Sequence, residues 1–258
     1  MPFADTHCHL DFSQFDRSRD LLLASCQEAA IDLIVVPATV SSGWDKIVAL
    51  CRRYQQLRPA LGLHPYFIAA HKDVHLAELD QYLARYSTSV VAVGEIGLDA
   101  FVDDISRQQY FFESQLYLAS KYRLPVILHS RKTHSHLMKC LKKGCFFGGV
   151  VHAFSGSKQE LEQFVTFGLK IGVGGVITWP NSTKTRKAIQ YAPLDSLVLE
   201  TDSPDMPVVG EAKGQSTPLN VLRVFESLCG LRRESPEELS VALWRNSLAL
   251  YGCDDVTI

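Results

Sequence analysis

Apolar and polar positions follow two different periods along the chain, and these predict the secondary structure. Short apolar runs rich in β-branched residues predict eight strands, at 3–6, 33–37, 60–63, 90–94, 126–128, 149–151, 170–173 and 197–201. Between them lie stretches with the spacing of amphipathic helices, among them 20–30, 44–56, 76–86, 107–122 and 158–167. Strands that alternate with helices pair in parallel through crossovers, so the pattern predicts an α/β protein with a parallel sheet.

The spacing of the predicted strands favours a closed barrel over an open sheet. Successive strand ends lie 22 to 34 residues apart, which suits one strand and one helix per step. An open doubly wound sheet more often has fewer strands and a glycine-rich phosphate loop, and no Gly-x-Gly-x-x-Gly follows the first strand. We therefore expect a single (β/α)8 TIM barrel domain over residues 1–258, closed by helices in the region 217–250.

Composition narrows the class of protein. Hydrophobic residues make up 47% and charged residues 21% of the chain, the usual balance of a globular protein with a buried core. The formal net charge is −2, so there is no chain-wide basic field that would hold a long nucleic-acid duplex. Any polyanionic substrate must therefore be bound locally.

The cysteines and the N-terminal residues predict the cellular compartment of the protein. The seven cysteines form no regularly spaced framework, so we expect reduced thiols and a cytoplasmic protein. The first residues, MPFADTHCHLDF, lack a cationic leader followed by an apolar stretch, and no apolar run is long enough to span a membrane. We expect neither a signal peptide nor a membrane partner. The oligomeric state does not follow from the sequence, and a monomer is the starting expectation.

Ionisable residues gather at the carboxyl ends of the predicted strands, where barrel enzymes have their catalytic groups. Six of the eight ends have a histidine or an acid: His7, His64, Glu95, His129, His152 and Asp202. The chain has nine histidines in 258 residues, so four strands ending in histidine form a strong constellation. The pattern predicts a metal-dependent site at this end of the barrel.

The first strand ends in His7-Cys8-His9. Side chains alternate along a strand, so both imidazoles face the barrel interior and bind a metal together, while Cys8 turns outward. Glu95 interrupts an apolar strand between two glycines. A buried carboxylate is costly without cations, so Glu95 requires metal ions or, as the alternative, an arginine.

The remaining strand-end residues complete the predicted ligand set. His129 and His152 are each compatible with a structural role, but together they are candidates for a second metal site, with Glu95 bridging the two ions. Asp202 supplies the final acid. Glu200 alternates to the other face, so we expect it to be a helix-facing salt-bridge partner.

Two further residues are candidates for substrate binding. His64 ends the third strand and is equally compatible with substrate contact and with a structural role. Arg131 follows His129 and either holds an anion or forms an ordinary salt bridge. Surface roles are expected for the histidines away from strand ends, which are His71, His75, His134 and His136.

Six segments resemble the TatD family of metal-dependent hydrolases, most closely its bacterial YjjV subgroup. The matching segments are 5–11, 62–65, 94–99, 128–131, 152–156 and 200–204, and segments 170–178 and 204–207 point to the subgroup. The resemblance implies an amidohydrolase-type TIM barrel, two divalent metal ions and deoxyribonuclease activity of the 3'-5' exonuclease kind. The family often has an Arg-Asn-Glu-Pro-like element where this chain has Gly214–Pro218, and Ser203 stands where alanine is usual.

The resemblance also implies roles for individual residues. One ion is assigned to His7, His9, Glu95 and Asp202, and the other to Glu95, His129 and His152. The ions would lower the pKa of a water, and Asp202 would position that water or accept its proton. From the residues themselves, four histidines with two carboxylates suit zinc, manganese, nickel or cobalt and, less well, magnesium, and the expected substrate is single-stranded DNA or DNA ends.

Two other functions remain open from the sequence. Related barrels hydrolyse carboxylic esters or amides with a similar metal pair, although many use a bridging lysine where this chain has Glu95. A metal-binding scaffold without catalysis is the other alternative. Activity on a phosphodiester would distinguish the predicted ester-bond hydrolase from both.

Overall fold

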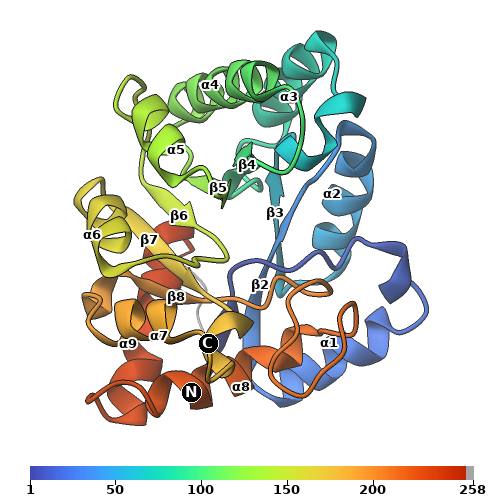
Figure 1. Ribbon diagram of the computed structural model, residues 1–258. Helices are drawn as coiled ribbons and strands as arrows, with labels where there is room; N and C mark the ends of the chain where they lie inside the picture. The colour runs from blue at the N-terminus through green and yellow to red at the C-terminus, as the bar shows by residue number, and fades with distance from the viewer. Residues whose placement is uncertain (254–258) are drawn as a thin grey trace. The chain divides into compact units, whose positions relative to one another are not determined.

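The computed structural model describes residues 1–253, in which strands and helices alternate along the chain (Figure 1). The strands are β1 Phe3–Asp5, β2 Ile31–Pro37, β3 Leu57–Leu61, β4 Ala92–Asp99, β5 Val126–Arg131, β6 Gly149–Val151, β7 Leu169–Val173 and β8 Leu197–Leu199. The α-helices are α1 Arg19–Glu28, α2 Trp44–Arg53, α3 Asp73–Arg85, α4 Ile105–Tyr122, α5 His134–Leu141, α6 Lys158–Thr166, α7 Thr183–Gln190, α8 Val221–Cys229 and α9 Pro236–Tyr251. The eight predicted strands and the five predicted helices are confirmed, with differences at their ends.

The strands follow one another in chain order in an eight-stranded sheet. Strand pairs within one compact unit are parallel. Strand and helix alternate, and α8 and α9 occupy the C-terminal region predicted to close the barrel. This is the topology of a (β/α)8 TIM barrel, and the predicted fold is therefore confirmed.

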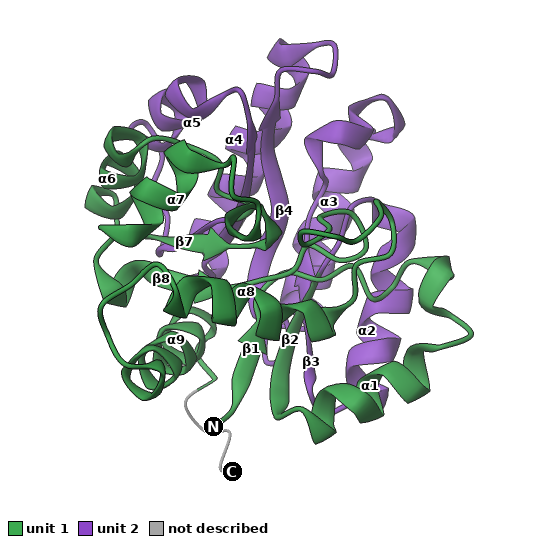
Figure 2. Ribbon diagram, turned by 60° about the horizontal axis from the view of Figure 1, so that its bottom comes forward, with its two compact units in different colours: residues 1–36, 152–258 green, residues 37–151 purple. Residues whose placement is uncertain are grey.

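The chain divides into two compact units (Figure 2). Unit 1 comprises Met1–Val36 and the chain from His152 onward, with β1, β7, β8 and most of β2. Unit 2 comprises Pro37–Val151, with β3 to β6 and helices α2 to α5. The single domain over residues 1–258 stays a prediction, and residues 254–258 lie outside the described part of the chain.

Burial on both faces explains why the strands are continuous apolar runs. Every residue of β4 is buried, and helix α4 packs on this strand. Parallel strands covered by helices lose contact with water on both sides, so their sequences do not alternate between apolar and polar residues. Several helix starts follow from the sequence as well, since Ser157 with Glu160 and Ser235 with Glu238 form capping boxes.

Strand β4 is longer than predicted. The sequence predicted this strand at 90–94, with Glu95 at its carboxyl end. Instead the ladder with β5 continues through Gly97, opposite His129, to Asp99, opposite Arg131. A Cβ on Gly97 would lie 2.0 Å from the His129 carbonyl oxygen, so glycine allows this close approach. Glu95 therefore lies inside the strand.

The lengths and the hydropathy of the helices show whether any of them could span a membrane. Within residues 1–253, none of them combines the length and the apolar character that crossing a bilayer requires.

Candidate metal centre

Glu95 lies at the centre of a buried cluster in unit 2. Its Oε1 atom is 2.7 Å from Nε2 of His64, which follows β3, and 2.8 Å from Nδ1 of His129 in β5. Candidate ligand atoms of these three residues lie within 4.8 Å of one another. In unit 2 the Glu95 carboxylate therefore lies between two imidazoles. The structure brings the predicted metal ligands Glu95 and His129 together with His64, a substrate-binding candidate from the sequence.

Backbone contacts determine how His64 faces Glu95. The amide of Tyr66 donates to Nδ1 of His64 at 2.9 Å, so the ring proton resides on Nε2 and is donated to Glu95. Nε2 of His71 donates to the His64 carbonyl oxygen at 2.9 Å. His71 is buried, and burial lowers its pKa. The predicted surface role of His71 is therefore wrong, because this side chain holds the segment after β3 in place.

Asp99 contacts His129 from the other side and was not among the predicted site residues. Its Oδ2 atom lies 3.1 Å from Nε2 of His129. Burial alone would raise the pKa of Asp99, but hydrogen bonds from His129 and from the Phe101 amide outweigh burial and lower it. The sequence contained a signal, since Asp99 stands four residues after Glu95 and alternation places both on one face of a strand.

The histidine pair after β1 forms a second cluster with Asp202, in unit 1. Nε2 of His7 and Nε2 of His9 are 3.3 Å apart, so both rings face one side, as predicted. Each of these nitrogens lies 3.5 Å from Oδ1 of Asp202. The His152 ring stacks on His7 with the centroids 3.9 Å apart. Candidate ligand atoms of His7, His152 and Asp202 lie within 4.8 Å of one another.

The backbone around Asp202 is unusual. Its φ angle is +53°, in the left-handed region that few side chains adopt, and its amide donates to the His7 carbonyl oxygen at 2.8 Å. Burial opposes ionisation of this carboxyl, but the hydrogen bond from His9 and the charges of His152 and His7 lower its pKa. Asp202 is therefore ionised at neutral pH and suited to bind a cation or accept a proton.

Glu200 does not have the predicted position. It was expected to face the helices, but it is fully buried, and its Oε1 atom accepts a hydrogen bond from the Ala153 amide at 2.5 Å and lies 3.9 Å from Nδ1 of His152. A Cβ on Gly172 would lie 2.2 Å from Oε2 of Glu200, so the glycine in β7 makes room for this side chain. Burial raises the pKa of Glu200 to about 8, against the opposing effects of His152 and the Ala153 amide.

Asp5 is a second support that the sequence did not identify. Its Oδ2 atom accepts from Oγ1 of Thr201 at 2.6 Å, and its Oδ1 atom accepts from the Thr201 amide at 2.9 Å and the His7 amide at 3.3 Å. Burial raises the pKa of Asp5 to about 7 although these groups donate to it. Asp5 therefore joins the backbone before His7 to the backbone before Asp202. An acid two residues before the candidate ligand His7 was the available signal.

The remaining candidates lie at the edges of the two clusters. Arg131 has a side chain that is 56% exposed, with Nη1 4.0 Å from Oδ2 of Asp99. In the segment after β8, the Ser203 hydroxyl donates to the Ser216 hydroxyl at 3.0 Å. The loop that departs from the TatD pattern is thus attached directly beside Asp202.

Both clusters have donors that fit divalent metal ions. Imidazole nitrogens with carboxylate oxygens are typical ligands of zinc, manganese, nickel and cobalt. Two nitrogens at about 2.1 Å from one tetrahedral ion lie about 3.4 Å apart, which is close to the 3.3 Å between the His7 and His9 nitrogens. Both ring nitrogens of His129 face carboxylate oxygens. A neutral imidazole has one N–H group, which here serves Asp99 through Nε2. Nδ1 therefore needs a second proton or a bound cation to face Glu95.

Comparisons with known proteins identify relatives over most of the chain. The family model "TatD related DNase" matches residues 4–252. The uncharacterized metal-dependent hydrolase YjjV of Escherichia coli K12 is 49% identical over 252 residues, which cover 96% of this chain and 97% of that protein. The 3'-5' ssDNA/RNA exonuclease TatD of Cronobacter turicensis is 32% identical over 206 residues, which cover 78% of this chain and 77% of that protein.

A solved structure agrees with these relationships. The crystal structure of YjjV, a TatD homologue from Escherichia coli K12, matches with a TM-score of 0.94 at 48% identity, covering 97% of this chain and 98% of that one. The family inferred from the six sequence segments is therefore confirmed. This chain belongs to the TatD family of metal-dependent hydrolases.

Proposed function

We propose that this chain is a divalent-metal-dependent nuclease that hydrolyses phosphodiester bonds of single-stranded DNA or DNA ends in the manner of a 3'-5' exonuclease. The observation that carries this proposal is the presence of two imidazole–carboxylate clusters, one in each unit, at strand ends, each with two buried residues and one partly exposed residue. The relative named as a 3'-5' ssDNA/RNA exonuclease supports the same substrate class.

The proposed centre holds two ions. The proposed ligands are His7, His9, Glu95 and Asp202 for one ion, and Glu95, His129 and His152 for the other. The strand ends of a (β/α)8 barrel open onto one face, which is the reason for proposing Glu95 as the shared ligand. Within unit 1, the short distances among His7, His9 and Asp202 support the first assignment.

The chain's own residues have distinct tasks in this proposal. When bound, the ions polarise phosphoryl oxygens and lower the pKa of water. Asp202, ionised and partly exposed, accepts the proton of the attacking water. The exposed guanidinium of Arg131 donates to phosphate oxygens. His64 lies beside the substrate and orients Glu95 through its Nε2–H group. Hydrolysis of this kind depends on positioning and charge, so it requires no covalent protein intermediate.

The charge balance favours an anionic substrate. Two divalent ions bring four positive charges, and the carboxylates of Glu95, Asp202 and Asp99 remove three. Glu200 and Asp5 together add less than one further negative charge at pH 7, because burial raises their pKa values to about 8 and about 7. The proposed centre therefore stays cationic in a chain whose formal net charge is −2.

Metal analysis combined with a substrate panel tests the proposal. We expect about two divalent ions per chain, and faster turnover of single-stranded DNA and bis-p-nitrophenyl phosphate than of p-nitrophenyl acetate at matched metal loading. Duplex DNA should be cleaved more slowly than single strands. A chelator should abolish the activity, and the removed metal should restore it.

The same panel evaluates the two alternatives. Equal or faster turnover of p-nitrophenyl acetate would overturn the phosphodiester proposal in favour of a carboxylic ester hydrolase. Full metal loading without turnover of any substrate would indicate a metal-binding scaffold. The cytoplasmic location and the monomeric state stay predictions.

A further inference from the structure

Exposed aromatic side chains lie beside His64 in unit 2. Tyr66 is 56% exposed and Phe67 is 36% exposed, in the short helix Pro65–Ala70 that follows β3. Their ring centroids are 5.2 Å apart and lie 6.5 Å and 5.9 Å from that of His64. Large aromatic surface is therefore open to solvent next to a residue that contacts Glu95.

A second exposed aromatic lies beside His129. Phe101 is 64% exposed, and its amide donates to Oδ1 of Asp99 at 2.8 Å. The guanidinium carbon of Arg131 lies 4.3 Å from the centroid of the Phe101 ring, and Arg131 pairs with Asp99 in the ladder between β4 and β5. The Arg131 guanidinium and the Phe101 ring thus stack on each other next to Asp99, the residue that contacts His129. Both side chains are more than half exposed to solvent.

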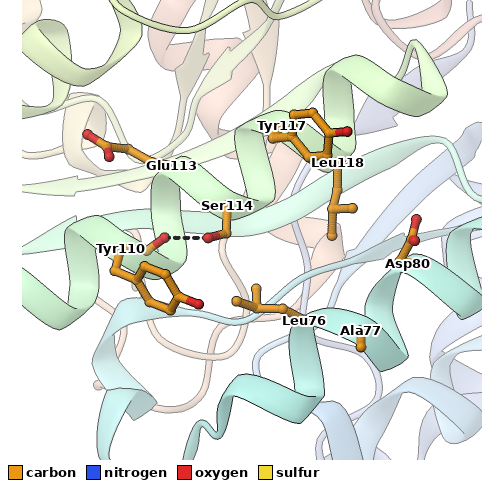
Figure 3. A pocket seen from close by; sticks show the side chains of 8 residues that line it. All are labelled: Leu76, Ala77, Asp80, Tyr110, Glu113, Ser114, Tyr117 and Leu118. Carbon is orange, nitrogen blue, oxygen red and sulfur yellow. Dashed lines mark hydrogen bonds between the residues drawn. The ribbon is translucent and has the colours of Figure 1, made fainter.

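Exposed aromatics elsewhere in unit 2 have different surroundings. A groove of about 490 Å³ lies between α3 and α4. Figure 3 shows side chains that line it, including Tyr110, Tyr117 and Glu113. The Glu113 carboxylate opposes the approach of a phosphate backbone, whereas the Asp80 carboxylate is ion-paired with Lys121. Tyr117, at 69% exposed, therefore serves as a control for an aromatic side chain that is accessible but has acidic neighbours.

We propose that Tyr66 with Phe67, and Phe101 with Arg131, form two stacking positions for the bases of single-stranded nucleic acid, one beside His64 and one beside His129. The inference rests on the proposed function, because it places the bases of the substrate whose phosphates the metal centre would cleave. Aromatic rings and guanidinium planes stack on any nucleobase, so these positions bind bases without selecting a sequence. Bases in a duplex are already stacked, so the same positions favour single strands.

Binding of two matched oligonucleotides tests this inference. One is an oligothymidylate of about ten nucleotides, and the other has the same phosphates but abasic sugars at its 3' end. Phosphorothioate linkages slow cleavage, so that fluorescence anisotropy reports the affinity of the metal-loaded protein. Cleavage of the same two sequences with ordinary linkages is measured in parallel.

We expect the natural protein to bind the base-containing oligonucleotide about tenfold or more tightly than the abasic one. Phe101→Ala and Tyr66→Ala should each reduce this preference severalfold and leave the affinity for the abasic oligonucleotide unchanged. Phe101→Tyr and Tyr66→Phe should retain the preference, because a ring remains. Tyr117→Ala should bind like the natural protein.

Two outcomes separate this inference from the proposed function. Equal affinity for the two oligonucleotides, or an equal loss for both in Phe101→Ala and Tyr66→Ala, would overturn the stacking positions, whether or not DNA is cleaved. Base-dependent binding that these variants abolish, without cleavage of either oligonucleotide, would support the stacking positions and refute the nuclease.

Discussion

The two clusters use the same residue types but differ in what surrounds them. In unit 1, the rings of His7, His9 and His152 pack on one another, and Asp202 is the carboxylate that faces them. In unit 2, Glu95 accepts from two imidazoles, and exposed side chains lie just beyond it. The clusters therefore differ in solvent access: the unit 1 histidines contact one another, whereas exposed side chains lie next to the unit 2 cluster.

The supporting acids also differ. Asp5 in unit 1 is bonded to backbone amides and to a threonine hydroxyl, and it has no contact with an imidazole among those bonds. Asp99 in unit 2 lies 3.1 Å from a ring nitrogen of His129. A carboxylate that is hydrogen-bonded to backbone amides stabilises the fold. A carboxylate that is hydrogen-bonded to a metal-binding imidazole fixes the orientation of the ring and decides which ring nitrogen is protonated. The following predictions test this contrast.

Glu95→Ala should have the largest effect. Glu95 is the proposed ligand of both ions, so we expect loss of metal and of detectable activity together, while Glu95→Gln retains part of the metal. Metal stoichiometry and kcat, with circular dichroism to verify folding, provide the measurement. A folded Glu95→Ala protein with both ions would contradict the bridging role.

Replacing His129 and His152 together with alanine should remove one of the two ions. The remaining ion keeps His7, His9 and Asp202, so metal content should fall from about two to about one per chain. The control is Tyr117→Ala, which lies outside both clusters. Full metal content in the double variant would show that this pair is structural.

Asp202→Asn should separate metal binding from catalysis. The amide oxygen still coordinates an ion but the group cannot accept a proton, so metal should be largely retained while kcat falls by roughly 10²–10⁴. Metal stoichiometry and kcat are measured on the same preparation. A nearly normal kcat with normal metal content would mean that another group accepts the proton, with His64 the next residue to replace.

Asp99→Asn should weaken metal binding in unit 2. Loss of the carboxylate beside Nε2 of His129 should reduce metal affinity or activity by about 10- to 100-fold, the usual effect of removing such a partner. A competition titration against a chelator measures the affinity without reference to turnover. Unchanged affinity would limit Asp99 to a structural role.

Asp5→Asn should have the smallest effect, although the substitution is the same. Asparagine retains an oxygen for the two amides and places an NH2 group near the Thr201 hydroxyl. We expect a loss of about 1 kcal/mol in the free energy of unfolding, with metal content and kcat close to those of the natural protein. Denaturant unfolding measures the loss. A large fall in metal affinity would remove the distinction between Asp5 and Asp99.

The sequence alone determined the order and the type of the elements. Barrel strands are buried on both faces, so each appears as an apolar run, and six of the eight ends are marked by a histidine or an acid. For this reason the sequence predicts the eight strands and the candidate metal ligands without knowledge of the contacts between elements. The end of β4 was misplaced, because pairing with β5 continues past Glu95 and this depends on the neighbouring strand.

The tertiary structure decided which side chains meet. Thr201 donates to Asp5 across 196 residues of chain, and Glu200 is buried because Gly172 leaves space for it on another strand. His71 is buried through a contact with the His64 backbone, although its position away from a strand end suggested the surface. Periodicity encodes which face of an element is buried, but partners distant in sequence are brought together only by packing between elements.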